Sequence, residues 1–251
     1  MRRIIMGHRG VPTLAPENTL ASFRMADQLR IPWVECDAEV LGDGTVVICH
    51  DADLKRCSNR SGKLAKLTKD DLKTIDAGSW FDIQFKGERI PTLEELLLFI
   101  NKSSLRLNLE IKSCPNSTLT HMLLDGVVTG LKLLWKKERP LIVSSFNHAV
   151  LAEFKKRMPD IPVACLFERN KLSSNWPEIM AQTNASYIHP SVKGLKQASV
   201  IEAKKRGYGI NVWTVNNLSK AVELFDWGVD GICTDIPQHF PEHWLDYTIN
   251  N

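Results

Sequence analysis

The chain has 251 residues, of which 43% are hydrophobic and 24% are charged, as in an ordinary soluble globular protein. These proportions exclude a disordered tail, a coiled coil and a small scaffold held together by disulfides. The 32 Lys and Arg residues against 29 Asp and Glu residues leave a formal net charge of +3, without a long run of one sign. We therefore expect neither a nucleic-acid partner nor a stable association with a membrane.

Cysteine spacing and the first residues bear on the cellular compartment. The six cysteines lie singly and far apart, without a C-x-x-C pair, so a disulfide framework or a zinc ribbon is not expected. The polar pair His8-Arg9 interrupts the apolar start too early for a secretory signal, and the sequence has no window of about 18 uninterrupted apolar residues. We expect a reduced, soluble protein of the cytoplasm, and the sequence leaves the oligomeric state open.

Short β-rich runs alternate along the chain with segments of helical periodicity. The expected strands are residues 3–7, 33–40, 105–111, 141–146, 163–167, 186–189, 209–215 and 231–234. Apolar residues recur at helical spacing in 93–100, behind a capping box of Thr92 and Glu95, and again in 124–134. A third stretch places an apolar face at Leu218, Ala221, Val222 and Phe225. Eight strands that alternate with helices predict an α/β fold, the TIM (β/α)8 barrel.

The apolar residues 46–49 break this alternation. They follow the second strand too closely for a crossover helix, so they are expected to return antiparallel to it. A two-residue turn of type I′ at Asp43-Gly44 would place Asp37 opposite His50. A slip of one residue would still leave the two near the same spot. The hairpin is therefore expected to carry His50 to the C-terminal end of the second strand, where a barrel keeps its chemistry.

Residues 51–90 fit the barrel pattern poorly. Gly, Ser and Asn divide them into short pieces, and Trp80-Phe81 is their main apolar content. We interpret the segment as a small subdomain inserted over the top of the barrel, within a single domain that spans residues 1–251. The sequence has no internal repeat, no low-complexity tract and no evident linker to a second domain.

Polar residues gather at the C-terminal ends of successive expected strands. The first strand ends in His8-Arg9-Gly10, the hairpin in His50-Asp51, the second strand in Glu35-x-Asp37 and the third in Glu110-x-Lys112. A spacing of two places both side chains of such a pair on one face of a strand. This recurrence, more than any single motif, indicates a functional site.

Three of these residues, Glu35, Asp37 and Glu110, are carboxylates that would converge in the mouth of a barrel. They would repel one another and acquire raised pKa values unless a cation neutralised them. We therefore interpret them as ligands of one divalent ion, and an all-oxygen set favours Mg²⁺ or Ca²⁺ over zinc. The alternative is that one or more of the acids pairs with Arg9 or Lys112 in a structural network.

The neighbouring cations and histidines suit a phosphate ester. Arg9 and Lys112 can neutralise a phosphate group whose negative charge grows in the transition state. His8 and His50 titrate in the range needed to give and take protons at neutral pH, so two histidines beside a phosphate can serve an attacking and a leaving oxygen. His189 ends the sixth strand, and whether it lines the pocket stays open. The remaining histidines are interpreted as structural: His121, His148, His239 and His243.

A further motif, Pro16-Glu17-Asn18-Thr19, precedes an amphipathic run. Either Asn18 or Thr19 is expected to cap the helix that follows. The closeness of the motif to His8 also allows it to support the site from behind.

Taken together, the motifs resemble those of the glycerophosphodiester phosphodiesterase family. The match runs from Arg3 to about Pro237, and residues 76–80 of the inserted segment are similar to the compact cytosolic bacterial members. The motifs that carry it, in order, are His8-Arg9-Gly10, Pro16-Glu17-Asn18-Thr19, Glu35-x-Asp37, His50-Asp51, Glu110-Ile111-Lys112, Trp213-Thr214-Val215-Asn216 and Thr234-Asp235.

The resemblance implies hydrolysis of deacylated phospholipids, such as glycerophosphocholine or glycerophosphoethanolamine, to sn-glycerol 3-phosphate and an alcohol. It assigns the residues by position: the metal to Glu35, Asp37 and Glu110, acid–base catalysis to His8 and His50, the phosphate to Arg9 and Lys112, and the lining of the substrate pocket to Trp213. The attacking hydroxyl is either water or the 2-hydroxyl of the glycerol. Trp80 and Phe81 either close over glycerol or form a small core.

Three other functions share part of this pattern. A related barrel phospholipase, of the D type or the phosphoinositide C type, would act on a lysolipid and should carry an exposed apolar loop, which the sequence lacks. A non-catalytic binding module on the same fold should have lost a metal ligand or a histidine, and all five are present. An aldolase-like barrel would use Lys112 as a Schiff base, but this does not explain three carboxylates.

Overall fold

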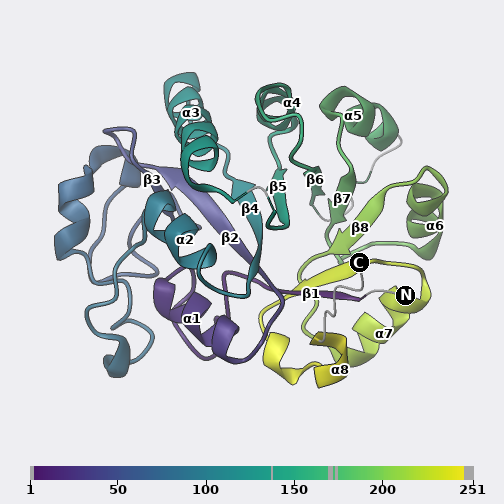
Figure 1. Cartoon of the computed structure of the whole chain (residues 1–251), viewed down its shortest axis with the longest axis horizontal. Helices are drawn as coiled ribbons and strands as arrows, with labels where there is room; N and C mark the ends of the chain where they lie inside the picture. Colours follow the sequence, from purple (N-terminus) through teal and green to yellow (C-terminus); the bar gives the residue numbers. More distant parts are fainter. Residues whose placement is uncertain (1–2, 137, 169–171, 173–174, 246–251) are drawn as a thin grey trace.

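The computed structural model describes residues 3–136, 138–168, 172 and 175–245. Eight parallel strands form a closed barrel, because β1 pairs with both β2 and β9 (Figure 1). The predicted TIM (β/α)8 fold is thus confirmed, with strand ends moved by three residues at most. The barrel strands are β1 (Ile4–Gly7), β2 (Trp33–Val40), β4 (Arg106–Ile111), β5 (Leu141–Ser145), β6 (Val163–Phe167), β7 (Tyr187–Pro190), β8 (Gly209–Val212) and β9 (Gly231–Thr234).

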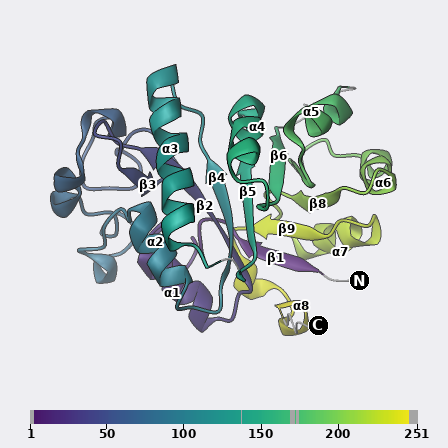
Figure 2. The ribbon, with the colours of Figure 1, turned by 45° about the horizontal axis from the view of Figure 1, so that its top comes forward.

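Helices cover the outside of the barrel, as Figures 1 and 2 show from two directions. They are α1 (Leu20–Gln28), α2 (Leu93–Ile100), α3 (Ser117–Leu134), α4 (His148–Arg157), α5 (Trp176–Thr183), α6 (Gln197–Lys205), α7 (Leu218–Asp226) and the short α8 (Glu242–Leu245). Their apolar faces and the outer faces of the strands form the main core. Among the described residues, no helix combines the length and apolar character needed to cross a bilayer.

The predicted helix signals hold for α2 and fail in part for α7. Both halves of the capping box are present in α2, since Glu95 N donates to Thr92 Oγ1 at 3.2 Å and Thr92 N donates to Glu95 Oε2 at 2.8 Å. In α7 the predicted apolar face is displaced, because Leu218 and Val222 are exposed. The buried side chains are Ala221, Leu224 and Phe225.

The short strand β3 (Val46–Ile48) runs antiparallel to β2, as predicted. The predicted two-residue turn is wrong, because Leu41 N donates to Thr45 O and three residues lie between them. The third of these, Gly44, has φ +89°, the left-handed conformation that closes a three-residue hairpin. The register therefore slips by one residue, and Cys49, not His50, pairs with Asp37.

The 51–90 segment connects β3 to α2 through three short 3-10 helices: η1 (Leu64–Lys66), η2 (Lys69–Thr74) and η3 (Ile83–Phe85). Figure 1 shows it, in blue, on one side of the barrel beside β2 and β3. It has an apolar cluster distinct from the main core, formed by Leu41, Val47, Leu54, Leu64, Leu72, Ile75, Ala77 and Ile90. The Trp80 and Phe81 rings pack edge to face against each other and Phe81 against Phe85.

Candidate active site

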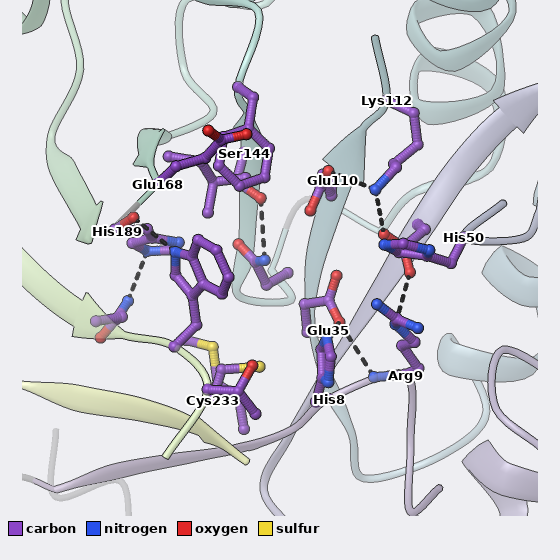
Figure 3. Close-up of a pocket in the computed structure, with 18 of the residues that line it drawn as sticks. His8, Arg9, Glu35, His50, Glu110, Lys112, Ser144, Glu168, His189 and Cys233 are labelled. Carbon is purple, nitrogen blue, oxygen red and sulfur yellow. Dashed lines mark hydrogen bonds and ion pairs between the residues drawn. The ribbon is translucent and has the colours of Figure 1, made fainter. Parts of the chain in front are cut away.

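A cavity of about 510 Å³ opens where the barrel strands reach their C-terminal ends (Figure 3). All eight residues selected from the sequence line it: His8, Arg9, Glu35, Asp37, His50, Glu110, Lys112 and Trp213. Trp80 and Phe81 are not among the described residues that line it. The cavity is where the chemistry of a (β/α)8 barrel is expected.

Three carboxylates form an acidic cluster in this cavity. Glu35, Asp37 and Glu110 are at most 8% exposed, and each offers an oxygen within 4.8 Å of the others. The parallel register of β2 and β4 causes this, because it places Asp37 directly beside Glu110 while Glu35 lies two residues before Asp37 on the same face. Among the described residues, these three form the group that could hold a metal ion.

The cluster is electrostatically costly without a bound cation. Burial and the charges of Asp37 and Glu110 raise the pKa of Glu35 well above its ordinary value. Burial and Asp37 raise the pKa of Glu110 to about 7. A divalent ion would oppose both shifts, and carboxylate oxygens are the ligands that Mg²⁺ and Ca²⁺ prefer. The donor set therefore fits such an ion.

Arg9 and Lys112 lie against the same acids. Lys112 Nζ contacts Asp37 Oδ1 at 3.1 Å and Glu110 Oε1 at 3.0 Å, and Arg9 Nε lies 3.3 Å from Asp37 Oδ2. Although burial opposes it, these two cations hold the pKa of Asp37 well below its ordinary value. The ion-pair alternative raised from the sequence is thus present together with the acidic cluster.

The turn after β1 places Arg9 at the site. Arg9 itself has φ +58° and Gly10 has φ +94°. Gly10 packs so closely on α1 that a Cβ there would lie 2.3 Å from Ser22 Oγ. In this turn Arg9 N donates to Glu35 Oε2 at 3.1 Å, so the backbone also contacts the acidic cluster. The glycine of the His8-Arg9-Gly10 motif is explained by this close approach.

The Pro16–Thr19 motif supports the site from behind. Thr19 is the N-cap of α1, since its side chain accepts from Ser22 N. Asn18 Nδ2 donates to Asp37 Oδ2 at 2.8 Å, and Arg9 Nη1 donates to Glu17 Oε1 at 2.7 Å. The cap and the contacts to the site are therefore made by different residues of one motif.

The two histidines of the site each contact a carboxylate through Nδ1. His8 Nδ1 lies 2.6 Å from Asp235 Oδ1, and His50 Nδ1 lies 2.6 Å from Asp51 Oδ1. A carboxylate accepts from an N–H, so both rings carry a proton on Nδ1 and keep Nε2 for other contacts. His8 Nε2 lies 4.0 Å from Glu35 Oε2, on the side of the acidic cluster. Burial lowers the pKa of His50.

The other half of the cavity is less charged, and the sequence identified it only in part. Trp213 packs edge to face on Phe146 and donates Nε1–H to the backbone oxygen of His189 at 2.9 Å. His189 lines the cavity, which answers the question that its sequence position left open. Asn108, Ser144 and Asn211 also line the cavity and were missed. The sequence feature that could have identified them is a polar residue at an inward-facing position within a strand.

Fold and site together define the chain as a TIM-barrel enzyme that hydrolyses phosphodiesters. Residues 8–239 match the model of the "Glycerophosphoryl diester phosphodiesterase family". The chain belongs to this family.

Solved structures and relatives agree over nearly the full length. An Oleispira antarctica phosphodiesterase, solved with its product sn-glycerol-3-phosphate, has a TM-score of 0.91 at 34% identity, covering 97% of this chain and 96% of that one. A glycerophosphodiester phosphodiesterase from Caldanaerobacter subterraneus is 33% identical, covering 95% of this chain and 96% of its own. One from Bacillus subtilis is 30% identical, covering 95% and 85%.

Proposed function

We propose that the protein is a metal-dependent enzyme that hydrolyses glycerophosphodiesters to sn-glycerol 3-phosphate and an alcohol. Substrates of this class are deacylated phospholipids such as glycerophosphocholine and glycerophosphoethanolamine. One observation of the geometry carries the proposal: two histidines paired with carboxylates, two cations and three clustered acids line one cavity. The phosphodiesterase of Oleispira antarctica, which was solved with sn-glycerol-3-phosphate, supports the same product for this chain.

In this proposal Glu35, Asp37 and Glu110 hold one divalent cation, Mg²⁺ or Ca²⁺, which when bound neutralises charge on the phosphodiester. Arg9 and Lys112 bind the phosphate oxygens and oppose the negative charge that grows on them. The side chain of Trp213 lines the substrate pocket beside Phe146.

His8 and His50 move the protons. One histidine takes the proton from the attacking hydroxyl as its oxygen forms a bond to phosphorus, and the other gives a proton to the alcohol oxygen as its bond to phosphorus breaks. Attack by water gives glycerol 3-phosphate directly. Attack by the 2-hydroxyl of glycerol gives a cyclic phosphate first, and phosphorus NMR at early times distinguishes the two routes.

The six cysteines are unpaired in the structure, which describes all of them. Reduced cysteines are typical of proteins in the cytoplasm, and we place the enzyme there with a soluble small-molecule substrate.

The experiment that tests the proposal is the release of glycerol 3-phosphate from a panel of head groups, with and without metal. We expect activity on glycerophosphocholine or glycerophosphoethanolamine that a chelator abolishes and Mg²⁺ or Ca²⁺ restores. Calorimetric titration of the chelated protein with each ion gives a second readout, and Asp37→Asn should weaken the binding. Full turnover in excess chelator would refute the metal site, while activity on lysophosphatidylcholine alone would favour the phospholipase alternative.

A further inference from the structure

A continuous network of ion pairs and hydrogen bonds joins two residues of the site through the 51–90 segment. Arg9 Nη1 donates to Glu17 Oε1 at 2.7 Å. Arg56 donates from Nη1 to Glu17 Oε2 at 2.6 Å and from Nη2 to Glu17 Oε1 at 2.8 Å. Arg56 Nε also donates to Asp51 Oδ2 at 2.6 Å, and Asp51 Oδ1 contacts His50 Nδ1 at 2.6 Å. The contacts of the network therefore run in the order Arg9, Glu17, Arg56, Asp51, His50.

Arg56 is the only member of this network that contacts both of its carboxylates, Glu17 and Asp51. All three guanidinium nitrogens are used, two on Glu17 and one on Asp51, which matches the rigid planar fork of arginine. Lysine has a single nitrogen on a flexible stem and cannot reproduce this geometry. The position therefore requires the shape of the guanidinium as well as its charge.

The two carboxylates that Arg56 joins each orient a residue of the site. The Glu17 side chain is only 11% exposed, so its charge needs partners, and both partners are arginines. Asp51 is more open, with a side chain 30% exposed. With Arg56 removed, Asp51 Oδ2 would turn to water, and the contact that holds the His50 ring would loosen. Arg56 itself is not among the described residues that line the cavity.

We propose that Arg56 is a positioning residue: it fixes Asp51 behind His50 and Glu17 behind Arg9, so that the 51–90 segment sets the geometry of the site. The inference rests on the proposed function for the roles of His50 and Arg9. Small misplacements of a positioned group have large effects on rate, because the reacting atoms must be held in a near-attack geometry. Arg56 therefore acts on turnover without touching the substrate.

A simpler interpretation is that Arg56 only attaches the segment to the barrel, and the chain offers a matched control for it. Arg24 of α1 donates from Nη2 to Glu88 Oε1 of the same segment at 2.6 Å. Its side chain is 49% exposed, against 45% for Arg56, but neither Arg24 nor Glu88 contacts a residue of the site through a described hydrogen bond or ion pair. Loss of attachment would affect both arginines alike, whereas loss of positioning would affect Arg56 alone.

The test compares Arg56→Ala, Arg56→Lys and Arg24→Ala by their kinetics on glycerophosphocholine and by thermal unfolding. We expect Arg56→Ala to lower kcat by roughly 10- to 100-fold, the range that misplacement of a positioned group reaches. Arg56→Lys should recover only part of kcat, and Arg24→Ala should stay within about twofold of the wild type, since exposed ion pairs contribute little. Low, non-denaturing concentrations of guanidinium should restore part of the kcat of Arg56→Ala and have no such effect on Arg24→Ala.

A spectroscopic readout separates this inference from the function on which it rests. In ¹⁵N-histidine NMR the wild type should show His50 with its proton on Nδ1, and Arg56→Ala should show a mixture of tautomers. An unchanged tautomer in Arg56→Ala, a wild-type kcat in that variant, or an equal loss in Arg24→Ala would each overturn the positioning role. If the wild type hydrolyses no glycerophosphodiester, the proposed function fails, and the NMR signal alone then decides whether Arg56 holds His50.

Discussion

Three histidines of one cavity have two kinds of environment. His8 and His50 each contact a carboxylate through Nδ1, whereas His189 is 4% exposed and receives Asn211 Nδ2 at 2.9 Å on its Nε2. The carboxylates fix the orientation of the His8 and His50 rings, while burial keeps the His189 ring neutral. His8 and His50 are therefore oriented for contacts through Nε2, and His189 forms part of the buried wall of the cavity.

Replacement of His50 by alanine tests its role in proton transfer. We expect His50→Ala to lower kcat by roughly two to four decades, the usual contribution of a positioned acid or base. The His50 side chain is 34% exposed, so the fold should persist, as far-UV circular dichroism can verify. The matched control is His121→Ala, an exposed histidine of α3 that should leave kcat unchanged. Near-normal turnover of His50→Ala would remove the residue from the mechanism.

Burial of His189 predicts a dependence of stability on pH. Burial lowers the pKa of His189 from 6.5 to about 3, so between these values the unfolded chain binds a proton there and the folded chain does not. The free energy of unfolding should therefore fall as the pH falls below 6.5, by at most about 1.4 kcal/mol per pH unit. Between pH 7 and pH 5, the free energy of unfolding of His189→Gln should therefore fall by about 2 kcal/mol less than that of the wild type. Urea unfolding at each pH measures this, and parallel curves for the two proteins would contradict it.

At the scale of the elements, the residues that the sequence could identify lie within strands or just after them. Glu35 and Asp37 share a face because strands alternate, and the register of β2 on β4 then brings in Glu110. Local rules suffice for such residues, since both the alternation and the barrel order follow from the apolar pattern. Predictions of such residues also tolerate small errors in register, because the one-residue slip of β3 still leaves His50 in the cavity.

Contacts between elements far apart in the chain could not be predicted in this way. Arg56 and Glu17 are 39 residues apart, and their pairing depends on how the 51–90 segment folds back on the turn before α1. The exposed positions of α7 have a similar origin, since periodicity shows that a helix has an apolar face but not how it is rotated on the barrel. Packing between distant elements decides both the Arg56–Glu17 pairing and the rotation of α7. Gly126 of α3 shows how close such packing is, since a Cβ there would lie 2.4 Å from Val46 Cγ2.

For the whole molecule, barrel closure brings the two ends of the chain to one site. His8 and Asp235 are 227 residues apart in the sequence, yet His8 Nδ1 lies 2.6 Å from Asp235 Oδ1. Although the formal net charge is only +3, charges of both signs are concentrated in one cavity, where the clustered acids contact two cations. The 51–90 segment adds its own apolar cluster and reaches this site through Arg56 and Asp51.

The division into a barrel and an inserted subdomain stays a prediction, which local unfolding can test. Leu64 is 1% exposed within the apolar cluster of the segment, and Leu64→Ala should cost about 2–5 kcal/mol there. If the segment opens on its own, amide hydrogen exchange should quicken across residues 51–90 while the strands of the barrel keep their protection. Leu107→Ala, in β4 of the main core, should instead quicken exchange throughout the barrel. Uniformly faster exchange in Leu64→Ala would mean that barrel and segment unfold as one cooperative unit.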